Sequence, residues 1–272
     1  MTLILNGCGN SKLSSITSED GNKYSCDYEG TTRSFLEYAP GSEARGILFM
    51  LHGHASTAEA FRSDVMMDED ACPRGYVTVY VTSDTDSWNS GIGDSDSDDI
   101  GFLKALAKYM QDKYDLNKEN TFAAGFSNGA FMMYRLAIEG EDTFKGVASV
   151  AGMMPEAMWN NKKDTANISL LQINGSKDDV VPMNSNGSAK YSKAPAIEDV
   201  IEYFANANDL KGSESESLSK KAELIKYYNN EKNNAVWHVL IKDGRHSWPD
   251  ENICGFSTNS LILDFFDEIN MK

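Results

Sequence analysis

The sequence lacks a long apolar run, and no stretch of its 272 residues reaches the ~18 apolar residues that a membrane-spanning helix needs. It is also poor in basic residues: 25 Lys and Arg stand against 41 Asp and Glu, which gives a formal net charge of −16. Such a surface repels phosphate backbones and anionic lipid headgroups. We therefore expect no nucleic-acid partner, no membrane span and no strongly acidic polymer as substrate, while neutral substrates fit the charge.

Cysteine is scarce as well, with only Cys8, Cys26, Cys72 and Cys254 in the chain. None of them lies in a Cys-x-x-Cys pair or at the Cys/His spacing of a zinc site, so we expect no bound metal. If the protein is exported, we expect one disulfide among Cys26, Cys72 and Cys254. Buried free thiols are the alternative.

The first 30 residues are rich in Ser, Asn and Gly and show no sustained periodicity, which predicts a loose leader before a catalytic domain over residues 31–272. Residues 3–8 (LILNGC) are similar to the end of a bacterial lipoprotein signal, although the basic start and most of the apolar run are absent. The alternatives are a lipid anchor at Cys8 and a short disordered tail. An export signal at this place would predict an extracytoplasmic protein, either secreted or lipid-anchored.

Strand and helix patterns alternate from Arg33 onward. Short apolar or alternating runs predict strands over 33–38, 46–51, 76–81, 121–126, 145–150, 168–173 and 236–241. Apolar residues at helical spacing predict helices over 99–114, 128–138, 197–207 and 261–269. This alternation predicts an α/β fold with a mostly parallel sheet and helices on both faces. The polar stretch 211–221 (KGSESESLSKK) breaks the pattern and predicts an exposed surface loop.

Residues 125–129 read G-F-S-N-G, the G-x-S-x-G pattern of a nucleophile elbow. Alone the pattern is weak, since roughly one chain in ten of this composition would carry it by chance. Here a predicted strand precedes it and a predicted helix follows it, as an elbow requires. The turn would place the Ser127 hydroxyl at a helix N-terminus, where free N–H groups favour a developing anion. We predict Ser127 as a nucleophile; a tight turn with a capping serine is the alternative.

A serine hydroxyl needs a base to remove its proton, and the chain has only four histidines. His238 falls within a predicted strand, and His52 and His54 lie in a loop before the elbow. His246 follows the last predicted strand, which brings it to the carboxyl end of the sheet beside the elbow. We therefore predict His246 as the base.

The orienting acid comes between serine and histidine in the chain order of this kind of enzyme. Asp178 and Asp179 both follow the predicted strand 168–173, and only one of them can face His246 in a given loop conformation. We choose Asp178, with Asp179 as the competitor.

An oxyanion hole needs two preorganised N–H donors. The backbone of Asn128, directly after the nucleophile, would supply one of them. The loop after strand 46–51 reads His52-Gly53-His54-Ala55, where the glycine permits close approach to a substrate. We predict the backbone N–H of His54 as the second donor.

Six motifs carry a resemblance to a known family: LHGHAS, WNSG, DDIGFL, GFSNGA, KDDVVP and HSWP, in this order. They resemble the esterases grouped with polyhydroxybutyrate depolymerases, feruloyl esterases and acetylxylan esterases (carbohydrate esterase family one and its relatives). The similarity runs from about Arg33 to the C-terminal helix and implies an α/β-hydrolase fold. It implies Ser127, Asp178 and His246 as a catalytic triad. The chain departs from the family in Asp179, where proline is usual, and in Asn174-Gly175, where His-Gly is usual.

The resemblance implies a serine carboxylesterase without a cofactor, acting on a small-molecule or oligosaccharide ester. The expected substrates are feruloyl or acetyl esters of plant polysaccharide, and polyhydroxyalkanoate oligomers or other short-chain esters are the alternative. A non-catalytic binding protein on a hydrolase scaffold is the rival. Trp88 and Trp248 would flank the cleft, either as substrate-binding walls or as packing between loops. The aspartates at 94–99 lack the glycine and glutamate of a calcium loop, so we expect a solvated loop and a helix cap.

Overall fold

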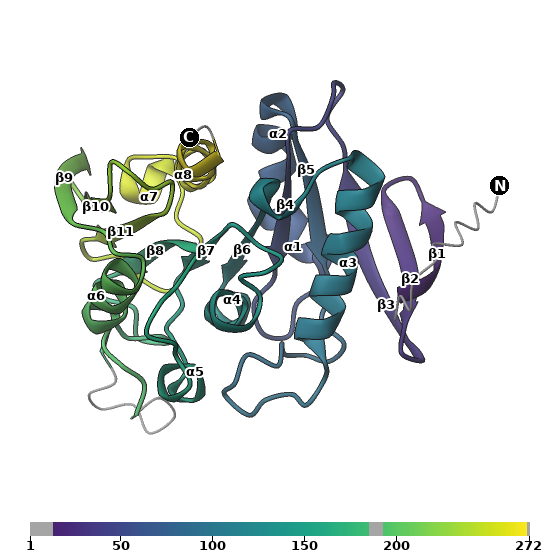
Figure 1. The fold of residues 1–272 in the computed structure, drawn as a ribbon, viewed down its shortest axis with the longest axis horizontal. Coiled ribbons are helices and arrows are strands. Elements are labelled where there is room, and N and C mark those ends of the chain that lie inside the picture. Colours follow the sequence, from purple (N-terminus) through teal and green to yellow (C-terminus); the bar gives the residue numbers. More distant parts are fainter. Residues whose placement is uncertain (1–12, 185–192, 271–272) are drawn as a thin grey trace.

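The computed structural model describes residues 13–184 and 193–270, and in this part of the chain the strands form one sheet. The sheet runs across Figure 1 from β1 at the right to β9 at the left, in the order β1-β2-β3-β5-β4-β6-β7-β8-β11-β10-β9. Its strands are β1 (Leu13–Asp20), β2 (Lys23–Tyr28), β3 (Thr31–Tyr38), β4 (Gly46–Leu51), β5 (Tyr76–Val81), β6 (Thr121–Phe126), β7 (Gly146–Val150), β8 (Ser169–Gly175), β9 (Gly212–Ser219), β10 (Ala222–Tyr228) and β11 (Ala235–Ile241). The run from β5 to β11 is parallel, and antiparallel strands extend it on both sides.

Helices cover both faces of this sheet. They are α1 (Ala58–Val65), α2 (Met67–Ala71), α3 (Asp99–Tyr114), α4 (Asn128–Glu139), α5 (Glu156–Asn160), α6 (Ile197–Ala207), α7 (Glu251–Cys254) and α8 (Thr258–Asn270). Buried side chains of α3, α4 and α6 belong to one hydrophobic core, and those of α1, α2 and α8 belong to a second core. The predicted α/β architecture, a mostly parallel sheet between two helical layers, is confirmed.

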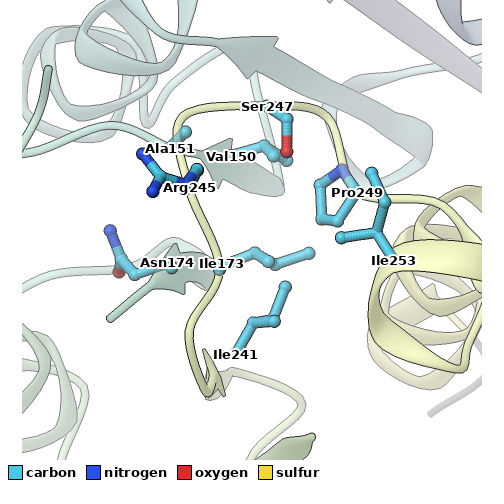
Figure 2. Close-up of a pocket in the computed structure, with 11 residues that line it drawn as sticks. Val150, Ala151, Ile173, Asn174, Ile241, Arg245, Ser247, Pro249 and Ile253 are labelled. Atoms are coloured by element: carbon cyan, nitrogen blue, oxygen red, sulfur yellow. The ribbon is translucent and has the colours of Figure 1, made fainter. Parts of the chain in front are cut away.

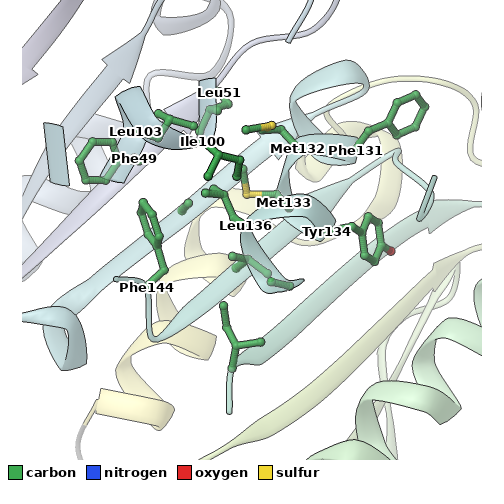
Figure 3. Close-up of a cluster of buried hydrophobic side chains, with 14 of the residues drawn as sticks. Phe49, Leu51, Ile100, Leu103, Phe131, Met132, Met133, Tyr134, Leu136 and Phe144 are labelled. Atoms are coloured by element: carbon green, nitrogen blue, oxygen red, sulfur yellow. The ribbon is translucent and has the colours of Figure 1, made fainter. Parts of the chain in front are cut away.

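Strand β4 shows why the central strands are continuous apolar runs. Phe49 and Leu51 point into the core under α4, where Figure 3 shows them with Met132 and Met133, while Leu48 and Met50 point into the opposite core. All four strand residues are fully buried. Since each such side chain contributes about 1.5–3 kcal/mol on burial, a central strand needs apolar residues at every position.

The prediction of a loose leader over residues 1–30 is wrong for the described residues, since β1 and β2 pair antiparallel with each other and β2 pairs with β3. The signal is a period of two in β2, where Cys26 and Tyr28 are buried and Tyr24 is half-buried. β1 is an edge strand in which only Leu13 is buried. Backbone hydrogen bonds hold it in place, so its side chains carry almost no hydrophobic pattern.

The prediction of a surface loop over 211–221 is wrong for the same reason. Residues 212–219 form the edge strand β9, which pairs with β10 through the backbone while its side chains stay exposed or half-buried. Charged and polar side chains on an edge strand prevent pairing with a further chain.

The thiols of Cys26, Cys72 and Cys254 are free, which agrees with the alternative of unpaired cysteines. Cys26 belongs to one core and Cys254 to the other, so the sheet separates them. The candidate anchor Cys8 lies outside the described residues. None of the described helices has the length and apolarity to cross a bilayer.

Candidate active site

The residues predicted to carry chemistry all follow strands that end at one edge of the parallel sheet. Ser127 follows β6, Asp178 follows β8 and His246 follows β11. Loops after β4 and β5 reach the same edge, which is where open α/β sheets bind their ligands.

Ser127 occupies a sharp turn between β6 and α4 with φ 54° and ψ −113°, a backbone conformation that non-glycine residues rarely adopt. Hydrogen bonds hold the turn from both sides. The Ser127 N–H donates to the Val150 carbonyl (3.0 Å), and the Phe131 N–H donates to the Ser127 carbonyl (3.0 Å). The strained turn fixes the serine at the first turn of α4.

The two glycines of the elbow are required by close backbone approach. A Cβ on Gly129 would lie 2.2 Å from the Leu51 carbonyl oxygen, and a Cβ on Gly125 would lie 2.3 Å from the Gly129 carbonyl oxygen. Real Cβ atoms do not approach backbone atoms so closely. The glycines therefore allow the first turn of α4 to press against the ends of β4 and β6.

Ser127, His246 and Asp178 form one hydrogen-bonded chain. The Ser127 Oγ lies 2.9 Å from His246 Nε2, and His246 Nδ1 lies 2.8 Å from Asp178 Oδ2. Because a carboxylate only accepts, Nδ1 carries the proton and donates it to Asp178. Nε2 is then the acceptor that faces the serine hydroxyl.

Asp178 rather than Asp179 faces the histidine. Its Oδ1 accepts hydrogen bonds from the backbone N–H groups of Val180 (2.9 Å) and Val181 (2.8 Å), and its side chain is 1% exposed. The Asp179 side chain is 77% exposed and lies 4.0 Å from the exposed Arg245 guanidinium. The structure thus brings together the three residues that we selected and leaves the competitor in solvent.

The loops that carry Asp178 and His246 are tied to each other. The Lys177 N–H donates to the Gly244 carbonyl (2.8 Å), and the Asp243 N–H donates to the Ser176 hydroxyl (2.8 Å). A cavity of about 10 Å³, with room for roughly one water, lies between the His246-bearing loop and the ends of β7, β8 and β11. Figure 2 shows the side chains that line it. The acid and the base are therefore held at a fixed separation.

The two predicted oxyanion donors lie on segments that flank Ser127. A Cβ on Gly53 would lie 3.5 Å from the Ser127 Cβ, so the loop after β4 runs directly beside the nucleophile. Asn128 begins α4, where the first N–H groups have no partner within the helix. Within residues 13–184 and 193–270, no backbone or side-chain atom accepts from the N–H of His54 or Asn128.

His52 organises this loop, a role that we did not predict. The buried ring accepts the Ser83 N–H at Nε2 (3.0 Å), so the proton sits on Nδ1, which donates to the Gly53 carbonyl (2.6 Å). Burial lowers the pKa of His52 and favours this neutral form. The Gly53 carbonyl and the His54 N–H belong to one planar peptide, so the His52 ring also sets the direction of that N–H.

Of the two alternatives for Trp88, a substrate-binding wall or packing between loops, its burial agrees with packing and contradicts the substrate wall. Trp88 is 0% exposed, and its indole Nε1–H donates to the His52 carbonyl (2.9 Å), so it packs between loops. Trp248 is half-buried and packs edge to face on Phe61, with 5.6 Å between the ring centroids. Its indole Nε1–H donates to the Asn259 side-chain oxygen (3.0 Å).

The aspartates at 94–99 divide into a cap and a buried ion pair. Asp98 caps α3 by accepting from the Gly101 N–H (3.0 Å), as expected. Asp99 is fully buried and pairs with the Arg33 guanidinium at 2.7 Å, so it is not part of a solvated loop. The described residues contain no group of three His, Cys, Asp or Glu side chains that could hold a metal ion.

Comparison with known proteins adds a family match. The model of the phospholipase/carboxylesterase family matches residues 38–226, which is more than half of the chain. The fold is similar to that of an acetyl xylan esterase from Aspergillus awamori, with a TM-score of 0.63 and 12% identity over 87% of this chain and 94% of that one. The predicted α/β-hydrolase fold is confirmed by this likeness.

Curated relatives are esterases too. The putative esterase NocK of Nocardia uniformis is 29% identical over 178 residues, which is 62% of this chain and 51% of that protein. Feruloyl esterase C of Emericella nidulans is 29% identical over 96 residues, 35% of this chain and 34% of the relative. The matches thus span about half or less of each relative, and the expected resemblance to this group of esterases is confirmed.

Proposed function

The chain belongs to the phospholipase/carboxylesterase family, and from this premise we propose that it is a serine carboxylesterase that works through an acyl-enzyme. The observation that carries the proposal is the hydrogen-bonded chain from Ser127 through His246 to Asp178 on a strained elbow. With Nδ1–H donating to Asp178, the His246 Nε2 acceptor faces the Ser127 hydroxyl, which is the arrangement that ester hydrolysis requires at its start.

In the first half of the reaction, His246 Nε2 takes the Ser127 proton as Oγ attacks the ester carbonyl. Asp178 stabilises the imidazolium that forms, through the Nδ1–H bond. The carbonyl oxygen becomes an oxyanion, which the N–H groups of Asn128 and His54 bind. When the intermediate collapses, His246 returns the proton to the departing alcohol.

In the second half, a water replaces the alcohol. His246 Nε2 removes a proton from this water, which attacks the acyl carbon through a second oxyanion intermediate. When this intermediate collapses, the bond from the acyl carbon to Ser127 Oγ breaks, the carboxylic acid is released, and His246 Nε2 returns its proton to Ser127 Oγ. No metal or cofactor takes part in these steps.

The proposed substrates are feruloyl or acetyl esters of plant polysaccharide. Relatives named feruloyl esterase and an acetyl xylan esterase of the same fold support this substrate class. The net charge of −16 favours neutral esters over strongly acidic polymers. Polyhydroxyalkanoate oligomers and other short-chain esters are the second substrate class.

The test compares hydrolysis of methyl ferulate and p-nitrophenyl acetate, with Ser127→Ala as the control for both. Comparable or better efficiency on methyl ferulate would show a cleft built for a phenolic acyl group, and activity on the acetate alone would show a small acyl pocket. A Ser127→Ala variant with full activity would overturn the mechanism.

The rival function, a binding protein without catalysis, makes the opposite prediction for covalent labelling. We expect a fluorophosphonate to label Ser127 in the folded protein and to leave Ser127→Ala unlabelled. A folded wild-type protein that resists the probe would favour the rival.

A further inference from the structure

Trp88 touches both segments that carry the proposed oxyanion donors. Its indole Nε1–H donates to the His52 carbonyl (2.9 Å), and its backbone N–H donates to the Asn128 side-chain carbonyl (2.7 Å). Its ring also lies 5.2 Å from the His52 ring, measured between centroids. One fully buried residue thus links the loop after β4 to the first residue of α4.

The segment behind Trp88 is itself anchored. The Asn89 N–H donates to Asp99 Oδ2 (2.7 Å), while Asp99 Oδ1 accepts from the buried Arg33 guanidinium (2.7 Å). Arg135 of α4 donates to the Asn89 carbonyl. Because a buried charge that loses its partner is costly, this ion pair keeps the backbone after Trp88 in one place.

We propose that Trp88 is a positioning residue that sets the distance and direction of the two oxyanion N–H groups by holding His52 and Asn128. The inference rests on the proposed function and adds a residue to its machinery. The path on one side runs from the indole to the His52 backbone and ring, and from that ring to the peptide that carries the His54 N–H. On the other side, the Trp88 backbone N–H donates to the Asn128 side-chain oxygen. Replacing the Trp88 side chain keeps this hydrogen bond, so such a variant tests the His52 path.

A displaced donor affects the transition state more than the ground state, because charge develops on the carbonyl oxygen only during the reaction. Loss of the indole N–H leaves the His52 carbonyl without its donor and frees the loop to shift. Removal of one oxyanion donor costs about 10²–10³ in kcat, so a misplaced donor should cost about tenfold or more.

The test compares Trp88→Phe with Trp237→Phe. Trp237 is also buried, but its indole Nε1 has no hydrogen-bond partner among the described residues. It packs against Phe265 of α8, in the other core. Both variants remove the same atoms from a buried site, and only Trp88→Phe removes a hydrogen bond to the oxyanion loop.

We expect Trp88→Phe to lower kcat on p-nitrophenyl acetate by about tenfold or more relative to Trp237→Phe, with KM within about twofold. A boronic acid that forms a tetrahedral adduct with Ser127 should bind more weakly by a similar factor. The pH profile of kcat/KM should keep its shape, because the His246–Asp178 pair is untouched.

The inference is overturned if the two variants have equal kcat, if the loss is confined to KM, or if boronate affinity does not change. If Trp88→Phe fails to fold, benzothienylalanine at position 88 replaces the indole N–H by sulfur in a side chain of nearly the same shape. The same three outcomes, measured on that variant, would then overturn the inference. Failure of the proposed function looks different, since the wild-type protein itself would then neither hydrolyse esters nor react with a fluorophosphonate.

Discussion

The environment of Asp178 leads to a sharp prediction for Asp178→Asn. In the native protein, Oδ1 accepts from the N–H groups of Val180 and Val181, and Oδ2 accepts from His246. An asparagine can keep the two backbone hydrogen bonds only if its oxygen takes the Oδ1 position. Its NH₂ group must then point at His246 Nδ1. In the flipped amide, the NH₂ group would face the N–H groups of Val180 and Val181, which are donors themselves.

The consequence is a change of tautomer. An NH₂ group facing Nδ1 makes Nδ1 the acceptor, so the proton moves to Nε2, which then points a donor at Ser127. A base that already carries its proton cannot accept the serine hydroxyl proton. We expect kcat to fall by about 10³–10⁴-fold at pH 7, which corresponds to about 4 to 5 kcal/mol in the activation free energy. The fold should persist, since the loop keeps both backbone hydrogen bonds.

The assay is steady-state hydrolysis of p-nitrophenyl acetate together with thermal unfolding. Asp179→Asn is the matched control, because it makes the same chemical change on a side chain that is 77% exposed, and we expect nearly wild-type kinetics. The reasoning is refuted if folded Asp178→Asn retains kcat within tenfold of the wild type, or if Asp179→Asn is the more damaged variant.

Two further predictions concern stability. Gly129→Ala places a Cβ 2.2 Å from the Leu51 carbonyl oxygen, so it should lower the melting temperature by about 6 °C or more, whereas Gly41→Ala, with no atom within 4 Å, should leave it unchanged. Burial lowers the pKa of His238, whose Nε2 has no partner among the described residues. As the pH falls, the imidazole of the unfolded chain is therefore protonated at a higher pH than that of the folded chain. The resulting loss of stability should appear below the unfolded pKa of about 6.5, and chemical denaturation at pH 7.5 and 5.5 should show a smaller loss for His238→Leu than for the wild type.

The centre of the fold is predictable from sequence because burial there leaves a hydrophobic pattern. The predicted strands 46–51, 76–81 and 121–126 coincide with β4, β5 and β6, whose residues are almost all buried. The edges are not predictable in this way, since β1 and β9 are held by backbone hydrogen bonds and show mostly exposed, polar side chains. Hydrophobic periodicity reports burial, and an edge strand has little of it.

In the candidate site, too, the residues that carry the chemistry are predictable from sequence, and the residues that support them are not. Ser127 and His246 could be selected because ester chemistry demands those side chains after particular strands. The same argument left Asp178 and Asp179 as candidates for the acid, and the family resemblance favoured Asp178, which the structure places beside His246. Nothing in a local pattern shows that a tryptophan 40 residues before Asn128 donates its backbone N–H to the Asn128 side chain. Such supporting contacts join loops that are distant in sequence, and their residues fit ordinary packing equally well. Only the arrangement in space shows that Trp88 contacts both Asn128 and His52. From these contacts we infer that this fully buried residue affects the rate at Ser127.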